Sequence, residues 1–286
     1  MKKPRSFDVL GNIAIVNFPM DFKLKDKKLF AEKLLKEQKQ VKTVLEKQGK
    51  VKGRLRKIKT KHLIGERTKE VLYKENGCVF RFNIDTTYFS PRLSNERKEI
   101  ASKIKKDENV LVMFAGVAPF SIVIAKNSKA KKVVSNEINR EANKYAKLNI
   151  ELNKLKNKVE LVSGDIKGVA RKLCVRYQSE AMKRCRPSEI RGRSARKIKG
   201  FPRFDVIVMP RPQLKDSFLE QAFMLSKKGT IIYYYDFCKF DETDLIVDKI
   251  KQEAKMFKKK IKILNVKQAG EIAPYKTRVR VDFRIL

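Results

Sequence analysis

Residues 109–137 read NVLVMFAGVAPFSIVIAKNSKAKKVVSNE. They contain two short apolar runs, one at each end, which are separated by a glycine-containing loop and a further apolar segment. The runs NVLVMFA and KKVVSNE have the composition of strands that a parallel sheet buries on both faces. Three more runs of this kind follow in the chain: KVELVSGD (158–165), FDVIVM (204–209) and GTIIYYYDF (229–237). Because helical segments alternate with these strands, the sequence predicts a doubly wound α/β sheet that binds ligands at the carboxyl ends of its strands.

The chain ends with two β-rich runs, KILNVKQAGE (262–271) and TRVRVDFRIL (277–286), that are joined by a short loop. An antiparallel pair at the edge of a parallel sheet is typical of class I methyltransferases, whereas a dehydrogenase more often continues with another crossover. Residues 91–286 are therefore predicted to form a class I (Rossmann-like) methyltransferase domain whose parallel sheet ends in an antiparallel strand pair.

Residues 1–90 predict a separate, small α+β module with basic surfaces. An apolar strand is expected within residues 6–20, and residues 77–90 alternate apolar and polar side chains as strands do. Between them, the segment up to about residue 61 is predicted to be largely helical. Its apolar residues recur at helical spacing: Leu29, Phe30, Leu34, Leu35, Val41 and Leu45. Residues 91–106 then predict a basic helix that leads into the second domain.

The 286 residues include 69 Lys and Arg against 32 Asp and Glu, which gives a formal charge of +37. Such an excess favours a polyanionic partner, because each cation brought to a nucleic-acid backbone releases counterions. A lysine-rich surface built from ion-pair networks would carry matching acids, which are missing here. Residues 171–203 concentrate 12 Lys and Arg with 2 Glu, and predict a basic loop, an RNA-contacting insertion, or both.

The lengths of the apolar runs and the spacing of the cysteines exclude several classes of protein. No stretch approaches the roughly 18–20 consecutive apolar residues of a membrane span, and the N-terminus lacks the features of a signal peptide. The four cysteines are scattered without a CxxC pair, so a disulfide framework or zinc site is not expected. We expect a monomer in the reducing cytosol, with no bound metal and no membrane contact.

A cofactor site is indicated at three successive strand ends. Gly116 follows the first strand, Glu137 ends the second strand 21 residues later, and Asp165 follows the third. A carboxylate at Glu137 can accept both hydroxyls of a ribose, and one at Asp165 can accept from the exocyclic amine of adenine. The GxGxxG set that a dinucleotide pyrophosphate requires is absent. The constellation therefore predicts S-adenosylmethionine and argues against NAD.

The motifs FSPRLSNER (89–97), VMFAGVAPFSI (112–122), NEIN (136–139) and YYYDF (233–237) resemble the archaeal–eukaryotic tRNA (guanine-N1)-methyltransferases that act at position 37. The resemblance extends from about residue 6 to the C-terminus, without the extra N-terminal domain of that family. It implies a class I methyltransferase domain joined to an RNA-binding module, with S-adenosylmethionine as cofactor and tRNA as partner.

The resemblance also implies roles for individual residues. Methylation of guanine N1 needs a base for the N1 proton and a donor for negative charge on O6. Glu96 aligns with the family's proposed base, and Arg56, in GRLR (53–56), with the O6-stabilising cation. Arg92 and Tyr88 align with positioning residues, and Pro212 with a retained proline after the fourth strand. The other residues expected at the cofactor are Arg97, Phe114, Ala115, Gly116, Val117, Glu137, Ile138, Asp165, Ile166 and Pro210.

Three departures from the family pattern leave the substrate open. Val112 replaces an acid, Ala118 replaces the second glycine, and Pro210 replaces the asparagine of the usual Asn-Leu-Pro. A reshaped base pocket would suit relatives that methylate a tricyclic wyosine precursor at carbon, alone or together with guanosine. The same departures allow a non-catalytic tRNA-binding protein on a decayed methyltransferase fold.

Overall fold

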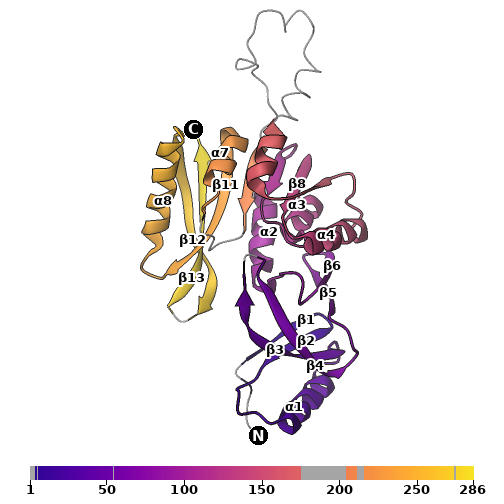
Figure 1. The fold of residues 1–286 in the computed structure, drawn as a ribbon. Helices are drawn as coiled ribbons and strands as arrows, with labels where there is room; N and C mark the ends of the chain where they lie inside the picture. The colour runs from indigo at the N-terminus through magenta and orange to yellow at the C-terminus, as the bar shows by residue number, and fades with distance from the viewer. Residues whose placement is uncertain (1–3, 5, 54, 175–203, 211–215, 274) are drawn as a thin grey trace, which may run out of the picture.

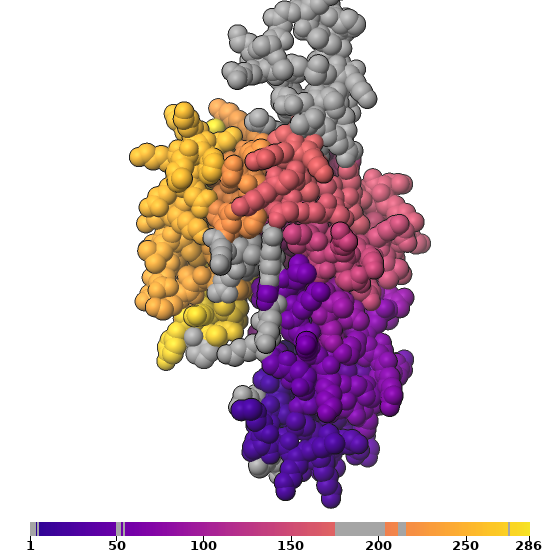
Figure 2. Space-filling view, in the orientation of Figure 1, coloured from indigo at the N-terminus to yellow at the C-terminus, as the bar shows by residue number. Residues whose placement is uncertain are grey.

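The computed structural model describes residues 4, 6–53, 55–174, 204–210, 216–273 and 275–286 (Figure 1). Pro212 and most of the basic segment 171–203 lie outside the described residues, and only 171–174 of that segment are seen, in a helix that begins at residue 166. Among the described residues, no helix is both long enough and apolar enough to cross a membrane. Figure 2 shows the N-terminal residues, in indigo, at one end of the molecule.

A seven-stranded sheet forms the centre of the larger domain, in the order β12-β13-β11-β10-β7-β8-β9. Five strands are mutually parallel: β7 (Asn109–Val112), β8 (Lys132–Glu137), β9 (Val159–Ser163), β10 (Phe204–Met209) and β11 (Ser226–Lys239). The C-terminal hairpin of β12 (Ile261–Ala273) and β13 (Lys276–Ile285) completes it, with β13 antiparallel to both neighbours. The predicted Rossmann-like sheet with an antiparallel end pair is confirmed.

Both faces of this sheet are buried, which explains the continuous apolar strands. Val110 and Val112 pack into the core beneath α2 (Ser94–Lys103), α3 (Pro119–Asn127) and α4 (Arg140–Leu152). Leu111 and Met113 point the other way, toward α7 (Leu219–Leu225), α8 (Thr243–Met256) and the helix 166–174. Alternate residues of one strand therefore belong to two separate cores.

The N-terminal module is a four-stranded sheet with one helix. Its elements are β1 (Ser6–Leu10), β2 (Ile13–Asn17), α1 (Leu24–Glu37), β3 (Thr43–Lys52) and β4 (Lys57–Gly65). The prediction of helix up to about residue 61 is wrong beyond Glu37. Val44 and Leu45 continue the helical spacing, but β3 pairs parallel with β2 and buries these neighbours in two different cores. Strand pairing over a long sequence distance overrides local periodicity here.

The hairpin of β5 (Glu70–Glu75) and β6 (Cys78–Asn83) packs on the larger domain. The Asn149 side chain on α4 donates to the carbonyl of Arg81 and accepts from its N–H, and Asn153 does the same with Val79. Phe80 and Phe82 join the core that contains α3 and α4. We therefore propose that the domain boundary lies between β4 and β5 rather than at residue 90, where the sequence had suggested it. A short 3₁₀ helix, η1 (Pro91–Leu93), then leads directly into α2.

We predict that Asn149→Ala lowers the free energy of unfolding by about 2–4 kcal/mol. The substitution leaves the part-buried backbone groups of Arg81, and the buried carbonyl of Val117, without the side chain that bonds them. Urea unfolding measures the change. The control is Lys147→Ala, an exposed position on the same helix, which should change stability by less than about 0.5 kcal/mol. Equal effects of the two substitutions would contradict this role for Asn149.

Candidate active site

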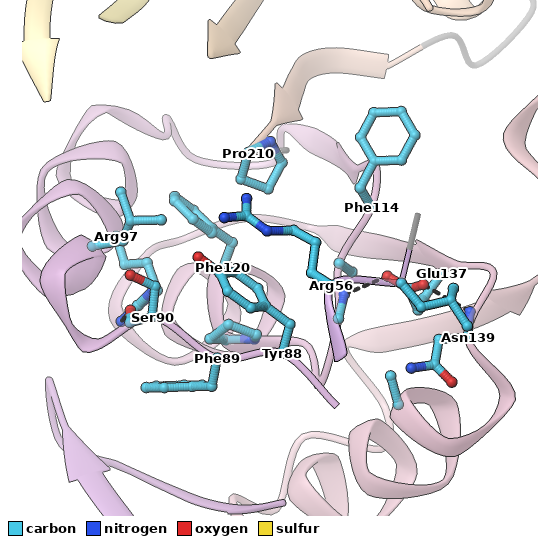
Figure 3. A pocket seen from close by; sticks show the side chains of 16 residues that line it. Arg56, Tyr88, Phe89, Ser90, Arg97, Phe114, Phe120, Glu137, Asn139 and Pro210 are labelled. Carbon is cyan, nitrogen blue, oxygen red and sulfur yellow. Dashed lines mark hydrogen bonds between the residues drawn. The ribbon is translucent and has the colours of Figure 1, made fainter. Parts of the chain in front are cut away.

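A cavity of about 650 Å³ lies at the carboxyl ends of β7, β8 and β10 (Figure 3). Its walls come from the loop after β7, from the end of β8, from the segment leading into α2 and from the turn before β4. Eight of the residues expected from the sequence line it: Arg56, Tyr88, Arg97, Phe114, Ala115, Gly116, Glu137 and Pro210. The carboxyl edge of the sheet thus holds a cavity where the strand pattern predicted one.

The loop after β7 has a constrained backbone. Phe114, Gly116 and Ala118 have φ values of 56°, 59° and 67°, in the left-handed region. Any other residue at Gly116 would be strained by this φ, and its Cβ would come 3.4 Å from the carbonyl oxygen of Tyr88. Ala118 is the N-cap of α3, and its left-handed φ is one that glycine adopts without strain. Left-handed residues outside glycine cost free energy and are retained mainly where a site demands them.

The carboxylate of Glu137 fixes this loop to the end of β8. It accepts hydrogen bonds from the backbone N–H groups of Gly116, Ile138 and Asn139 at 2.7, 2.8 and 2.7 Å. The side chain is 8% exposed and lines the cavity. Since a carboxylate offers about four lone-pair positions, three N–H donors leave about one for a ligand.

Arg56 crosses the centre of the cavity between Tyr88 and Pro210 (Figure 3). Its guanidinium carbon lies 4.2 Å from the centroid of the Tyr88 ring, a cation–π distance. Arg56 itself has a φ of 52°, so the turn that presents it is strained. Pro210 follows β10 directly and offers no side-chain donor. The charge of Arg56 therefore faces a cavity wall to which Pro210 contributes no hydrogen-bond donor.

Arg97 forms one wall of the cavity and is itself almost fully buried. Its guanidinium forms a bidentate ion pair with Glu75 on the β5–β6 hairpin, including a 2.6 Å hydrogen bond, and donates to the Ser90 carbonyl at 3.0 Å. It also lies over the rings of Phe89 and Phe120. These contacts hold the segment before α2 against the hairpin.

Glu96, the expected general base, lines neither this cavity nor the second one described below. Its carboxylate accepts from Tyr235 at 2.9 Å and from Arg280 at 2.5 Å, and pairs with Lys267 at 2.9 Å. Burial, followed by the charge of Glu96, raises the pKa of Tyr235 well above its ordinary value, so Tyr235 is a hydrogen-bond donor. Glu99 and Asp282 also bind Arg280, and together these groups attach α2 to the C-terminal hairpin.

Four other residues expected at the cofactor do not line the cavity. Val117 is fully buried, and its carbonyl accepts from Asn149. Ile138 contributes only its N–H to Glu137, and Ile166 packs in the core under α7. Asp165 caps the helix 166–174 by accepting from the N–H of Lys167, and it does not line the cavity. The side chains of Val117 and Ile166 lie in the core, so their predicted contribution to the cofactor site rests on their backbone groups.

Sequence reasoning did not identify several residues of the site. Asn139, the N-cap of α4, lines the cavity and donates to the carbonyl of Thr86. The other unexpected wall residues are Leu55, Phe89, Ser90, Leu93, Pro119, Phe120 and Ala142. Arg280 and Lys267 were also missed, although the alternation in RVRVD was a signal for charges on one face of β13. In the described part of the chain, no three His, Cys, Asp or Glu side chains are grouped to hold a metal ion.

Comparisons with known proteins match nearly the whole chain to one family. Two family profiles match it: the TYW2 N-terminal domain at residues 1–68, and the TRM5/TYW2 methyltransferase domain at residues 71–179. The tRNA (guanine(37)-N(1))/4-demethylwyosine(37)-methyltransferase Taw22 of Nanoarchaeum equitans (strain Kin4-M) is 34% identical, across 98% of this chain and 100% of its own.

Two solved structures from this family also match nearly the whole chain. The crystal structure of Trm5b from Pyrococcus abyssi is 32% identical with a TM-score of 0.78, and the match covers 99% of this chain and 75% of that one. The complex of aTrm5 and tRNALeu is 27% identical with a TM-score of 0.75, covering 99% and 72%.

We predict that Glu99→Gln reduces the dependence of stability on acid pH. The hydrogen bond from Arg280, with others from Lys103 and Lys267, lowers the pKa of Glu99 below its ordinary value. A carboxylate with a lowered folded-state pKa stabilises the fold above its unfolded pKa of about 4.3, and this contribution is lost as the pH falls further.

The measurement is urea unfolding between about pH 6 and about pH 2. The wild-type protein should lose more stability over this range than Glu99→Gln. Glu37→Gln is the control, because it removes only an exposed partner of Lys33 and should keep the wild-type dependence. Identical pH curves for Glu99→Gln and the wild type would show that the Arg280 network does not stabilise the ionised carboxylate.

Proposed function

The chain belongs to the TRM5/TYW2 methyltransferase family, and we propose that it transfers the methyl group of S-adenosylmethionine to N1 of guanosine 37 in tRNA. Similarity to enzymes with this activity over the full chain supports the proposal. The structural observation that supports it most is Glu137, held by the Gly116 loop at the edge of a cavity that also contains Arg56.

The residues of the cavity fit this cofactor. Glu137 retains an acceptor position for a ribose hydroxyl, and Phe114 and Ala115 supply apolar walls. Asp165, at the neighbouring strand end, is proposed to accept from the adenine amine. When bound, the cofactor supplies a methyl group on a positively charged sulfur.

The reaction then requires residues of the chain to accept the N1 proton and to stabilise the negative charge that develops on O6. Neutral guanine carries a proton on N1, which must leave before or during attack. We propose that the carboxylate of Glu96 accepts it. Because this carboxylate is held by Tyr235, Arg280 and Lys267, it must exchange at least one of them for the N1–H group.

Arg56 is proposed to stabilise the negative charge that develops on O6. Within the described residues its guanidinium forms no hydrogen bond or ion pair, and its main contact is the Tyr88 ring. A cation that is already oriented in a largely apolar cavity stabilises such charge more strongly than one in water.

A second substrate, the tricyclic wyosine precursor at the same position, is supported by one observation. Pro210 occupies the place of the amide that would bind the edge of guanine, and it lines the cavity. The relative from Nanoarchaeum equitans is named for both activities. We propose that this chain accepts the tricycle in addition to guanosine.

We predict that Glu137→Ala raises the dissociation constant for S-adenosylmethionine by about tenfold or more. The substitution removes an acceptor to the ribose and frees three N–H groups that shape the loop. Isothermal titration calorimetry measures the constant. Glu141→Ala, on the exposed side of the first turn of α4, is the control and should bind as the wild type does. Unchanged affinity in Glu137→Ala, or no binding by the wild type, would contradict the cofactor proposal.

We predict that Glu96→Gln lowers the single-turnover rate on tRNA with guanosine 37 by ~10²–10⁴-fold, because the base is lost. Higher pH should restore part of the rate, since guanine N1 loses its proton unaided in the alkaline range. On the tricyclic substrate the proton leaves from carbon after attack, so the methyl-transfer step should be spared.

The matched control is Glu99→Gln, which removes another carboxylate partner of Arg280 and should retain a rate within about tenfold of the wild type. Cofactor binding and thermal unfolding of both variants separate catalysis from folding. Equal rates for the two variants on guanosine would assign Glu96 a structural role only.

A further inference from the structure

A second cavity, of about 1030 Å³, lies between the N-terminal module and the C-terminal hairpin. The module contributes Leu10, Ile15 and Ile58, while Ile272 on β12 and Arg278 on β13 come from the hairpin. This cavity adjoins the first one, because the two share four wall residues: Arg56, Tyr88, Phe89 and Ser90. A ligand that enters the first cavity can therefore extend into the second.

The charged residues of the second cavity are mostly cations. Lys47, Arg56, Arg92 and Arg278 line it, against a single carboxylate, Asp8. Asp8 contacts Arg92 at 3.4 Å, with both side chains well exposed, so this ion pair is weak. The cavity therefore has a net positive charge that the described residues do not neutralise.

Arg278 is the most unusual of these cations. Its side chain is only 5% exposed, and its Nε has no hydrogen-bond partner. Its guanidinium carbon lies over the ring of Phe237, 5.3 Å from the ring centroid. Arg280, two residues along the same strand, is equally buried but bonded to Glu96, Glu99 and Asp282. A buried guanidinium without a counter-anion costs free energy unless a ligand supplies one.

Neighbouring charges increase this cost. Burial lowers the pKa of Arg278, and the nearby cations Arg56 and Arg92 also lower it, whereas Tyr88 and Tyr235 act in the opposite direction. Like charges brought together in a cavity are typical of a site that binds an anion.

We propose that Arg278, together with Arg92, binds a backbone phosphate of tRNA adjacent to the nucleotide that is methylated. The inference rests on the proposed function, since it needs a nucleotide whose base enters the first cavity. A nucleotide placed there has its phosphates next to the shared wall, on the side of the second cavity.

The alternative anion, the carboxylate of the cofactor, fits less well. Arg278 does not line the cavity that contains Glu137, whereas it lines the cavity between the N-terminal module and the C-terminal hairpin. A phosphate also has enough acceptor oxygens to engage several guanidinium groups at once. The cofactor carboxylate remains an outcome that the experiment distinguishes.

The test compares Arg278→Gln with Arg284→Gln, a change of the same charge at an exposed position on the same strand. We expect Arg278→Gln to raise the dissociation constant for tRNA by about tenfold to a hundredfold, and Arg284→Gln by much less. The slope of log affinity against log salt should decrease by about 1 in Arg278→Gln. The dissociation constant for S-adenosylmethionine should stay as in the wild type.

Neutral methylphosphonates at the phosphates flanking nucleotide 37 then identify the contact. One of them should weaken binding to the wild type and to Arg284→Gln, but not weaken binding to Arg278→Gln further. Additive losses would overturn the proposal, as would a loss of cofactor affinity in place of tRNA affinity. If the wild type bound tRNA but methylated neither substrate, the proposed function would fail while the phosphate contact stood.

The melting temperature distinguishes a binding role of Arg278 from a structural one. Arg278→Met removes the unpaired charge and keeps most of the volume, so we expect a melting temperature equal to or above that of the wild type. The same variant should lose tRNA affinity. A lower melting temperature with unchanged tRNA affinity would make Arg278 a structural residue and overturn the proposal.

Discussion

Two adjacent buried charges on α2, Glu96 and Arg97, connect the three parts of the molecule that surround the cavities. Arg97 pairs with Glu75 on the β5–β6 hairpin, and Glu96 pairs with Arg280 on the C-terminal hairpin. Removing one member of a buried pair leaves the other without compensation, which costs about 3–5 kcal/mol. The position of the 88–97 segment, which lines both cavities, therefore depends on these two pairs.

The parallel sheet could be predicted from the sequence because its strands are marked locally. A strand buried on both faces is a continuous apolar run, and each of the five parallel strands has one. The N-terminal module was less predictable. Val41 and Leu45 fit a helix as well as Leu34 does, and only the pairing of β3 with β2, across the intervening helix, decides against it. Pairing partners distant in sequence leave no local periodicity to detect.

The site was predictable to the extent that strand ends define it. Glu137 and Gly116 were expected from their spacing, and the structure bonds them directly. Orientation was not predictable, because neighbouring residues in a loop point in different directions: Val117 faces the core while Gly116 faces the cavity. The motif likewise identified Glu96 but not its partners, since Tyr235 and Arg280 lie 139 and 184 residues away in sequence.

Arg278 and Arg280 show how a single strand can divide structural and ligand-binding roles. Both lie on one face of β13, opposite Phe237 and Tyr235 of β11, and both are almost fully buried. Arg280 has three carboxylate partners, so its charge is compensated within the fold. Arg278 has none in the described residues, and the sheet that holds it is stabilised by the pairs around Arg280. The uncompensated charge of Arg278 in the wall of the second cavity is thus held on a strand that the ion pairs of Arg280 fix to α2.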